Sequence, residues 1–309
     1  MAPRTLDRRI RLAEAAHRYY VDGWSQDEVA QLLQTSRSNV SRLLDTARRE
    51  GVVRFVIDHP LRRHPALERA LSDKFRVRRA IVVAEADPSL DLVGRTAAAT
   101  LLEEIEDAAT VAIGWGRTVE SVIDSIESEN AHDIEVVQVG GDLTMAPSAS
   151  GHELVKRLAD RLGGRHRFLH APALVASESV ASELLADEHI GRGLALAAAA
   201  KVALIGIGLP GTGFAEKAVA NSYTGELRPA AVVCARLIDE HGEELPGPLS
   251  RRVIAIGLDT VRAIPETIGV AAGTDKGPAI AAALNGELID TLICDQPAAA
   301  AALDSGEHR

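Results

Sequence analysis

A short polar run near the N-terminus, Arg37 to Arg42, combines two arginines with serine and asparagine side chains. Such donors and acceptors suit the base edges and phosphates of a DNA major groove. Ser36 can cap a helix that starts at Arg37, and apolar residues then recur at helical spacing until Gly51, which is placed to end the helix. The polar run would therefore lie on the first exposed turns of a helix, where DNA is read.

A second helix is predicted directly before this one. Ser25 and Glu28 have the spacing of a capping box, and apolar residues follow on one face. Residues 7–22 are expected to form a further helix that packs Ile10, Ala13, Ala16 and Tyr20 behind the pair. Two helices joined by a tight turn make a helix-turn-helix. The predicted DNA contacts are Ser25, Gln26, Ser36, Arg37, Ser38, Asn39, Ser41 and Arg42.

The charge distribution favours DNA binding over the alternative, an ordinary capped helix pair with a solvated face. Residues 1–54 contain ten arginines and seven acidic residues, whereas the whole chain has a formal net charge of −10. The remaining 255 residues therefore carry −13. Because this acidity would repel nucleic acid, DNA contact should be local and multiplied by oligomerisation, as a dimer or tetramer.

Length and composition indicate two domains. A chain of 309 residues with 46% apolar residues can bury a large core. We expect a helix-turn-helix domain over residues 1–56, a short strand at 52–58 that can form a wing, and a larger domain over residues 57–309. The chain has neither a signal-peptide pattern nor an apolar run long enough for a membrane span, which predicts a cytoplasmic protein. The two cysteines are expected to be reduced structural thiols.

After residue 80 the pattern changes to short apolar runs that alternate with helical stretches. The expected strands are 80–85, 110–114, 134–140, 167–171, 202–208, 230–239, 267–273 and 291–295. The expected helices are 65–75, 89–106, 117–128, 151–162, 177–200, 276–285 and 296–303. Near-continuous apolar strands that alternate with helices predict an α/β domain with a mainly parallel sheet covered on both faces.

Several of these strands end in glycine, at the edge where open α/β sheets bind ligands. In the segment IGWGRTVESVI a strand reaches Gly114, and Gly116, Arg117 and Thr118 open the next helix. Amide groups at a helix N-terminus, a hydroxyl and a guanidinium make a cradle for a phosphate. The alternative is that these glycines only close tight turns. The turn has neither GxGxxG nor the Walker lysine pattern, which disfavours nucleotide binding through those motifs.

Two further charged residues follow strand ends. Lys276 stands at the start of a helix, where a cation opposes the helix dipole and is tolerated when it serves an anion. The alternative is a solvated lysine. Asp239 ends the run VVCARLID and can accept hydrogen bonds from sugar hydroxyls or form a turn. Because no catalytic, metal-binding or cofactor motif is evident, the sequence favours binding over catalysis.

Taken together, these segments resemble the SorC/DeoR-type sugar-binding transcriptional regulators over nearly the whole chain. The resemblance rests on YYVDGWSQDEVAQLLQTSRSNVSRLLDTARREGVV, IGWGRT, VVQVGG, IPETIGVAAGTDKGPAIAAAL and TLICD in this order. It implies an effector domain similar to phosphosugar isomerases and deaminases, an oligomeric regulator that binds a double-stranded DNA operator, and a phosphorylated sugar as effector. The predicted effector contacts are Gly114, Gly116, Arg117, Thr118, Gly140, Gly141, Gly208, Asp239 and Lys276.

The chain departs from the family pattern at two positions. Arg117 precedes Thr118 where some relatives have paired threonines, and Val139 precedes Gly140 where others have a basic residue. These differences leave another sugar phosphate or a nonphosphorylated polyol as the effector. Two alternative functions also remain at this point: a sugar-phosphate isomerase or deaminase with an appended DNA-binding domain, and a DNA-binding protein whose large domain only oligomerises.

Overall fold

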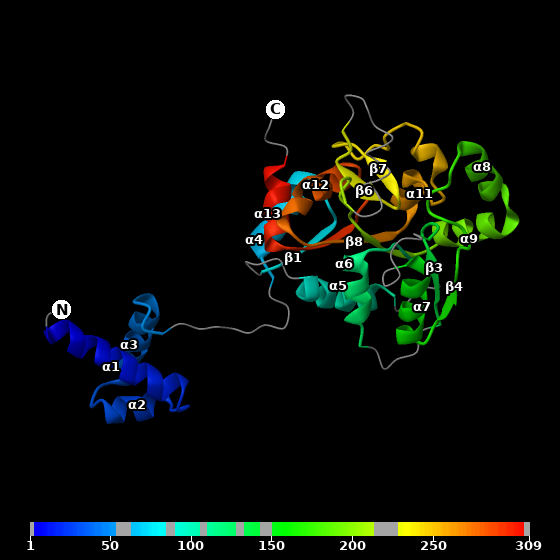
Figure 1. The fold of residues 1–309 in the computed structure, drawn as a ribbon. Coiled ribbons are helices and arrows are strands. Elements are labelled where there is room, and N and C mark those ends of the chain that lie inside the picture. The colour runs from blue at the N-terminus through cyan, green and yellow to red at the C-terminus, as the bar shows by residue number, and fades with distance from the viewer. Residues whose placement is uncertain are drawn as a thin grey trace. The chain divides into compact units, whose positions relative to one another are not determined.

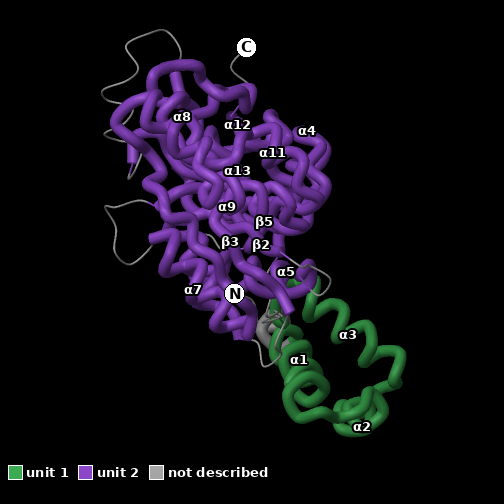
Figure 2. Tube along the Cα trace, turned by 90° about the vertical axis from the view of Figure 1, so that its right-hand side faces the viewer, with its two compact units in different colours: residues 1–60 green, residues 61–309 purple. Residues whose placement is uncertain are grey.

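A computed structural model describes residues 3–53, 63–84, 90–105, 110–127, 133–142, 150–212 and 228–305, the side chains of residues 3–7 excepted. The chain divides into two compact units, residues 1–60 and 61–309, which Figure 2 shows in different colours. The predicted domain boundary at residue 56 and the predicted wing fall largely in 54–62, outside the described residues. No described helix is long and apolar enough to cross a membrane.

Unit 1 is a helix-turn-helix supported by a preceding helix. Its helices are α1 (Pro3–Tyr20), α2 (Gln26–Leu32) and α3 (Arg37–Arg49). The buried side chains are Leu12, Ala15, Ala16, Val29, Ala30, Val40, Leu44 and Ala47. The predicted packing face of α1 was wrong by part of a turn, because Ile10 is 53% exposed and Leu12 is buried in its place. Gly51, which follows α3, has a backbone φ of +68°, as expected of the glycine that ends a helix.

Unit 2 is built on a seven-stranded sheet in which every pairing is parallel (Figure 1). The strand order is β1 (Arg79–Val83), β9 (Thr291–Asp295), β8 (Glu266–Ala271), β5 (Val202–Gly206), β2 (Thr110–Ile113), β3 (Glu135–Gln138) and β4 (Arg165–Arg167). This order confirms the predicted parallel α/β fold. Because all strands run the same way, the loops after β2, β3, β5, β8 and β9 leave the sheet at one edge.

Helices cover both faces of this sheet, as the near-continuous apolar strands predicted. One face packs against α5 (Leu90–Glu104), α6 (Arg117–Asp124) and α7 (Gly151–Leu162). The other packs against α4 (Pro65–Phe75), α9 (Glu188–Ala198), α11 (Leu258–Ala263), α12 (Gly277–Asn285) and α13 (Gln296–Asp304). Helix α8 (Glu178–Ala186) is separated from α9 by Asp187, which caps α9, so the predicted single helix 177–200 is two helices.

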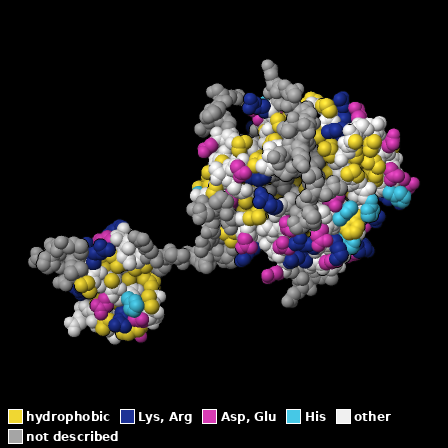
Figure 3. Space-filling model, viewed as in Figure 1, with side chains coloured by type: hydrophobic (Ala, Val, Ile, Leu, Met, Phe, Trp, Pro, Cys, Tyr) yellow, Lys and Arg dark blue, Asp and Glu magenta, His cyan; other side chains and the backbone are white. Residues whose placement is uncertain are grey.

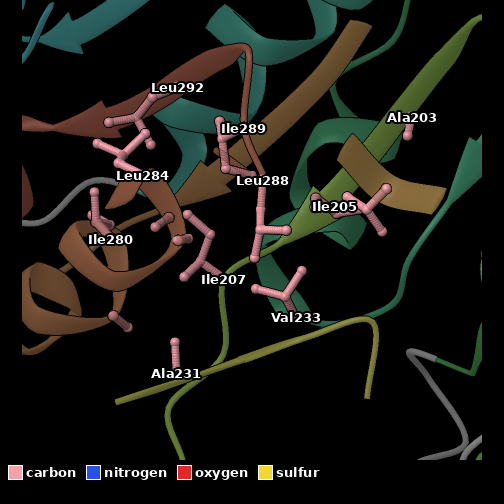
Figure 4. Close-up of a cluster of buried hydrophobic side chains, with 14 of the residues drawn as sticks. Ala203, Ile205, Ile207, Ala231, Val233, Ile280, Leu284, Leu288, Ile289 and Leu292 are labelled. Atoms are coloured by element: carbon pink, nitrogen blue, oxygen red, sulfur yellow. The ribbon is translucent and has the colours of Figure 1, made fainter. Parts of the chain in front are cut away.

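The predicted strand 230–239 is instead an antiparallel hairpin of β6 (Ala231–Val233) and β7 (Arg236–Ile238). The two turn residues, Cys234 and Ala235, have φ values of +49° and +63°. Positive φ at both central positions defines the type I′ turn of tight hairpins, which glycine and asparagine usually form. Figure 4 shows Ala231 and Val233 of β6 in one apolar cluster with Ile205 of β5. Ile207, directly after β5, and Leu288 belong to the same cluster.

The contact between α5 and α6 gives a test of this packing. A Cβ built at Gly94 of α5 would lie 2.3 Å from Ser121 Oγ and 2.7 Å from the Ser121 carbonyl oxygen of α6. We expect Gly94→Ala to lower the free energy of unfolding of unit 2 by about 1–3 kcal/mol, because the backbone oxygen cannot rotate away. Urea denaturation followed by Trp115 fluorescence in a Trp24→Phe background measures this loss.

The matched control is Gly211→Ala, because a Cβ there meets no atom within 4 Å. It should change the free energy of unfolding by less than about 0.5 kcal/mol. Equal effects of the two substitutions would contradict the close α5–α6 contact.

Candidate DNA-binding face and effector site

Helix α3 contains most of the predicted DNA contacts. The Ser36 side chain accepts a hydrogen bond from the Asn39 amide and so starts the helix as predicted. Because Val40, Leu44 and Ala47 are buried, the opposite side of α3 faces solvent. At 100° per residue, the residues centred on that side are Ser38, Arg42, Asp45 and Arg49, all exposed. The dark blue side chains on unit 1 in Figure 3 are arginines, because residues 1–60 contain no lysine.

The other predicted contacts border this outer face. The Asn39 Nδ2 atom donates to Thr35 Oγ1 at 2.7 Å, and both Asn39 and Ser41 are half-buried. Arg42 Nε donates to the Ser38 carbonyl at 3.4 Å, which keeps the guanidinium along the exposed face. Arg37 Nη1 lies 3.9 Å from Asp27 Oδ2 and so connects the two helices across the turn. Among the predicted contacts, Arg42 is therefore the charged side chain that lies on the outer face.

In α2, Ser25 serves the helix itself. Ser25 and Glu28 form the complete predicted capping box, with the Glu28 carboxylate accepting from the Ser25 amide at 2.8 Å. This backbone hydrogen bond, followed by the one from the Ser25 hydroxyl, lowers the pKa of Glu28. Gln26 follows in the first turn and is half-buried. Ser25 therefore has a structural role as the N-cap of α2, whatever its part in the predicted DNA contact.

Two exposed residues on the outer face of α3 were not among the predicted contacts. Asp45 and Arg49 follow Ser38 by seven and eleven residues and therefore lie on the same face. Asp45 Oδ1 accepts from Arg48 Nη2 at 2.8 Å. The helical period could have identified both residues, but the prediction was restricted to the first turns of the helix.

In unit 2, the turn after β2 has the features of an anion site. Gly116 adopts φ +125°, a conformation that favours glycine, and a Cβ at this position would meet no atom within 4 Å. Gly116 is the N-cap of α6 without a side-chain cap, so the first amides of α6 begin the helix without that partner. Arg117 is exposed and Thr118 half-buried beside them. The helix dipole and the guanidinium both favour a negatively charged ligand.

Lys276 supplies a second cation at the same edge of the sheet. Its Nζ atom donates to the Ile207 carbonyl at 2.8 Å, directly after β5, the strand next to β2. Burial lowers the pKa of the Lys276 ammonium, Asp275 opposes this shift, and the positive charge of Arg117 adds to it. The two cations therefore repel each other, and an anion held between them would relieve this repulsion.

Three of the predicted glycines, Gly140, Gly141 and Gly208, pack closely against other segments of the protein. Cβ atoms would lie 2.6 Å from the Ala255 Cβ atom at Gly140 and 2.5 Å from the Ala171 carbonyl oxygen at Gly141. The Gly141 amide donates to Ile254, and the Gly208 amide donates to Val232. These glycines allow the close approach of neighbouring chain segments. Gly114 likewise donates to Leu204 and continues the sheet.

Asp239 lies apart from the cations. Its Oδ1 atom accepts from the amides of His241 and Glu243 at 2.9 and 3.0 Å, so Asp239 forms the turn that the sequence left as an alternative. The carbonyl of the adjoining Glu240 accepts from Asn285, at the C-terminal end of α12, whereas Lys276 precedes the N-terminal end of this helix. At 1.5 Å per residue, α12 is about 13 Å long.

The chemistry of the described residues suits binding. Within the described ranges, no group of three or more His, Cys, Asp or Glu residues could hold a metal ion. Both cysteines are buried, and burial raises the pKa of Cys234 to about 12 and raises that of Cys294 as well. Both thiols therefore stay protonated near neutral pH and are poor nucleophiles. The Arg117–Lys276 edge is suited to holding an anionic group.

Comparison with known proteins agrees with this architecture. Residues 59–304 match the Sugar-bind family model, which describes a sugar-binding domain. The chain is 29% identical to the deoxyribonucleoside regulator of Bacillus subtilis over 307 residues, which cover 93% of this chain and 95% of the relative. It is 27% identical to the Escherichia coli transcriptional regulator YjhU, with 90% and 89% of the two chains covered.

Solved structures show the same fold. The full-length sorbitol operon regulator SorC of Klebsiella pneumoniae superimposes with a TM-score of 0.69 at 23% identity, covering 96% of this chain and 99% of SorC. A DeoR family transcriptional regulator from Listeria monocytogenes gives a TM-score of 0.68 at 24% identity, covering 77% of this chain and 98% of that one. The family match spans well over half of the sequence. The chain therefore belongs to the SorC/DeoR-type family of sugar-binding transcriptional regulators.

Proposed function

We propose that the protein binds an operator through the outer face of α3 and that a phosphorylated sugar, held by Arg117, Thr118 and Lys276, changes the affinity of this binding. The observation that carries the proposal is the pair of cations, Arg117 and Lys276, beside the uncapped N-terminus of α6. A phosphate is the common biological anion that suits such a site. Relatives named for sorbitol and deoxyribonucleosides support a carbohydrate ligand.

The proposed DNA contacts differ in whether they can bind phosphates, bases or both. Arg42 can contact a phosphate or a guanine, and Ser38 can hydrogen-bond to any base. Asn39, Ser41 and Arg37 would add contacts at the border of the face, and Ser25 and Gln26 would approach the backbone from α2. Since one short helix reads few base pairs, we infer a dimer or tetramer that places two copies of α3 on adjacent half-sites.

We further propose that the large domain binds its ligand without turning it over. The relatives are named as transcriptional regulators, and the buried thiols are unsuited to nucleophilic catalysis. The effector then acts through its different affinities for two conformations of the protein. Turnover of a sugar phosphate by the purified full-length chain would contradict this part of the proposal.

The proposed DNA-binding face is tested by substitution of Arg42. We expect Arg42→Ala to weaken operator binding by about 1–3 kcal/mol, roughly 5- to 150-fold. If the guanidinium contacts a phosphate, the slope of log affinity against log salt should fall by about one. Fluorescence anisotropy with labelled operator DNA at several salt concentrations measures both quantities.

Arg192→Ala is the matched control, because this exposed arginine of α9 forms an ion pair within one helix of unit 2. The same change of charge at this position should leave the affinity and the salt slope as in the unsubstituted protein. Unchanged affinity and slope in Arg42→Ala would refute the assigned reading face.

The proposed anion site is tested by the pH dependence of anion binding. Because the pKa of Lys276 is lowered, its ammonium loses its proton at a lower pH than an ordinary lysine. The affinity for sulfate, an anion whose charge does not change above pH 7, should therefore fall as pH rises through this pKa when it is measured by calorimetry. Lys276→Arg should move the alkaline loss to higher pH, because guanidinium stays protonated.

Lys276→Ala should remove this alkaline loss and bind sulfate about tenfold or more weakly near neutral pH, because a charge-assisted hydrogen bond is lost. A pH profile that is the same with and without the lysine would place the anion elsewhere.

A further inference from the structure

The side chain of Asp295, at the end of β9, is a fully buried carboxylate, with 0% of the residue exposed. It accepts hydrogen bonds from two backbone amides that lie far apart in the sequence. The Gly273 amide lies 3.2 Å from Oδ1 and 3.0 Å from Oδ2, and the Ala298 amide lies 3.0 Å from Oδ1. A buried carboxylate is costly unless such hydrogen bonds compensate for lost hydration.

Capping of α13 explains only one of these hydrogen bonds. Asp295 is the N-cap of α13 through Ala298, but serine performs this task in other helices of the chain. The serine N-caps are Ser25, Ser36, Ser150 and Ser177. A serine oxygen can accept from one helix amide without the cost of burying a charge. What the longer, two-oxygen carboxylate adds is the bond to Gly273.

Gly273 begins the segment that carries Lys276. It adopts φ +107° and leads directly into the short 3-10 turn Thr274–Lys276, after which α12 starts. At Gly277 the backbone lies so close to α13 that a Cβ would be 2.5 Å from the Ala301 Cβ atom. The segment is therefore fixed at both ends, by Asp295 at Gly273 and by α13 at Gly277, with Lys276 between them.

We propose that Asp295 is a positioning residue of the effector site: by holding the Gly273 amide, it aims Lys276 at the carboxyl end of β5, where the ammonium meets the ligand. This inference rests on the proposed role of Lys276 in anion binding. In this proposal Asp295 makes no contact with the ligand and acts on ligand binding only by positioning Lys276. Its loss should therefore weaken anion binding only when Lys276 is present.

A double-mutant cycle tests this dependence. Asp295→Ser retains an oxygen for the α13 cap but is too short to hold Gly273 as well, and inorganic phosphate is the probe. The fluorescence of Trp115, next to Gly116, reports binding in a Trp24→Phe background, because these are the two tryptophans of the chain. We expect Asp295→Ser to weaken phosphate binding about tenfold, which corresponds to about 1.4 kcal/mol.

In a Lys276→Ala background, Asp295→Ser should change phosphate affinity by less than about twofold, because residues that act through one another are not additive. The same loss in both backgrounds, or no loss in either, would overturn the positioning role. Absence of phosphate binding in the unsubstituted protein would instead refute the proposed anion site, so the two failures are distinguishable.

Asp187→Ser is the matched control. Asp187 caps α9 with its Oδ1 atom, which accepts from the amides of His189 and Ile190, but it is exposed. This substitution should leave phosphate affinity unchanged, and a tenfold loss here would contradict the proposal because any aspartate cap would then have the same effect.

If Asp295→Ser fails to fold, hydrogen exchange of the unsubstituted protein decides the question. The Gly273 amide should exchange at least 100-fold more slowly than an exposed loop amide, and saturating phosphate should slow it further. Exchange at the rate of an exposed loop, or a rate that phosphate leaves unchanged, would overturn the proposal.

Discussion

A half-buried lysine ammonium held against a backbone carbonyl is the interaction on which the proposed effector site depends. Lys276 Nζ reaches the Ile207 carbonyl only because β8 and β5 are neighbours and end at the same edge of a parallel sheet. The neighbouring strand β2 brings Arg117 and the start of α6 to this edge. Two cations close to each other are unfavourable, so the protein maintains an arrangement that an anion would stabilise.

Arg63, near the start of unit 2, also lies at this edge of the sheet, because it pairs with Val83 at the end of β1. Val83 of β1 pairs in register with Asp295 of β9, and its other neighbour is Arg63, through an isolated bridge. The guanidinium of Arg63 is bound by Glu68, whose carboxylate also accepts from the Val82 amide. Arg63 follows directly on residues 54–62, which connect to unit 1. In the strand order, β9 and β8 lie between β1, which pairs with Arg63, and β5, at whose end we propose the effector site.

The sequence predicted most elements that depend on hydrophobic periodicity and capping. Both caps of the helix-turn-helix and the glycine turn at Gly116 lie where expected, because short-range chemistry determines them. The β6–β7 hairpin was missed because Cys234 and Ala235 are not typical residues of a type I′ turn, and tertiary packing holds them there. Asp295 has no local signal beyond a helix cap, since its partner Gly273 is distant in the sequence. The proposed ligand contacts remain predictions.

The most direct test measures operator affinity of the full-length chain with and without a panel of sugar phosphates, in the unsubstituted protein and in Lys276→Ala. If the two units are coupled, at least one sugar phosphate should change the operator affinity of the unsubstituted protein by about 5- to 150-fold, a typical coupling between sites. The same compound should have no effect on Lys276→Ala, although this variant still binds the operator. An operator affinity that no sugar phosphate changes, or a change that persists without Lys276, would contradict control through this site.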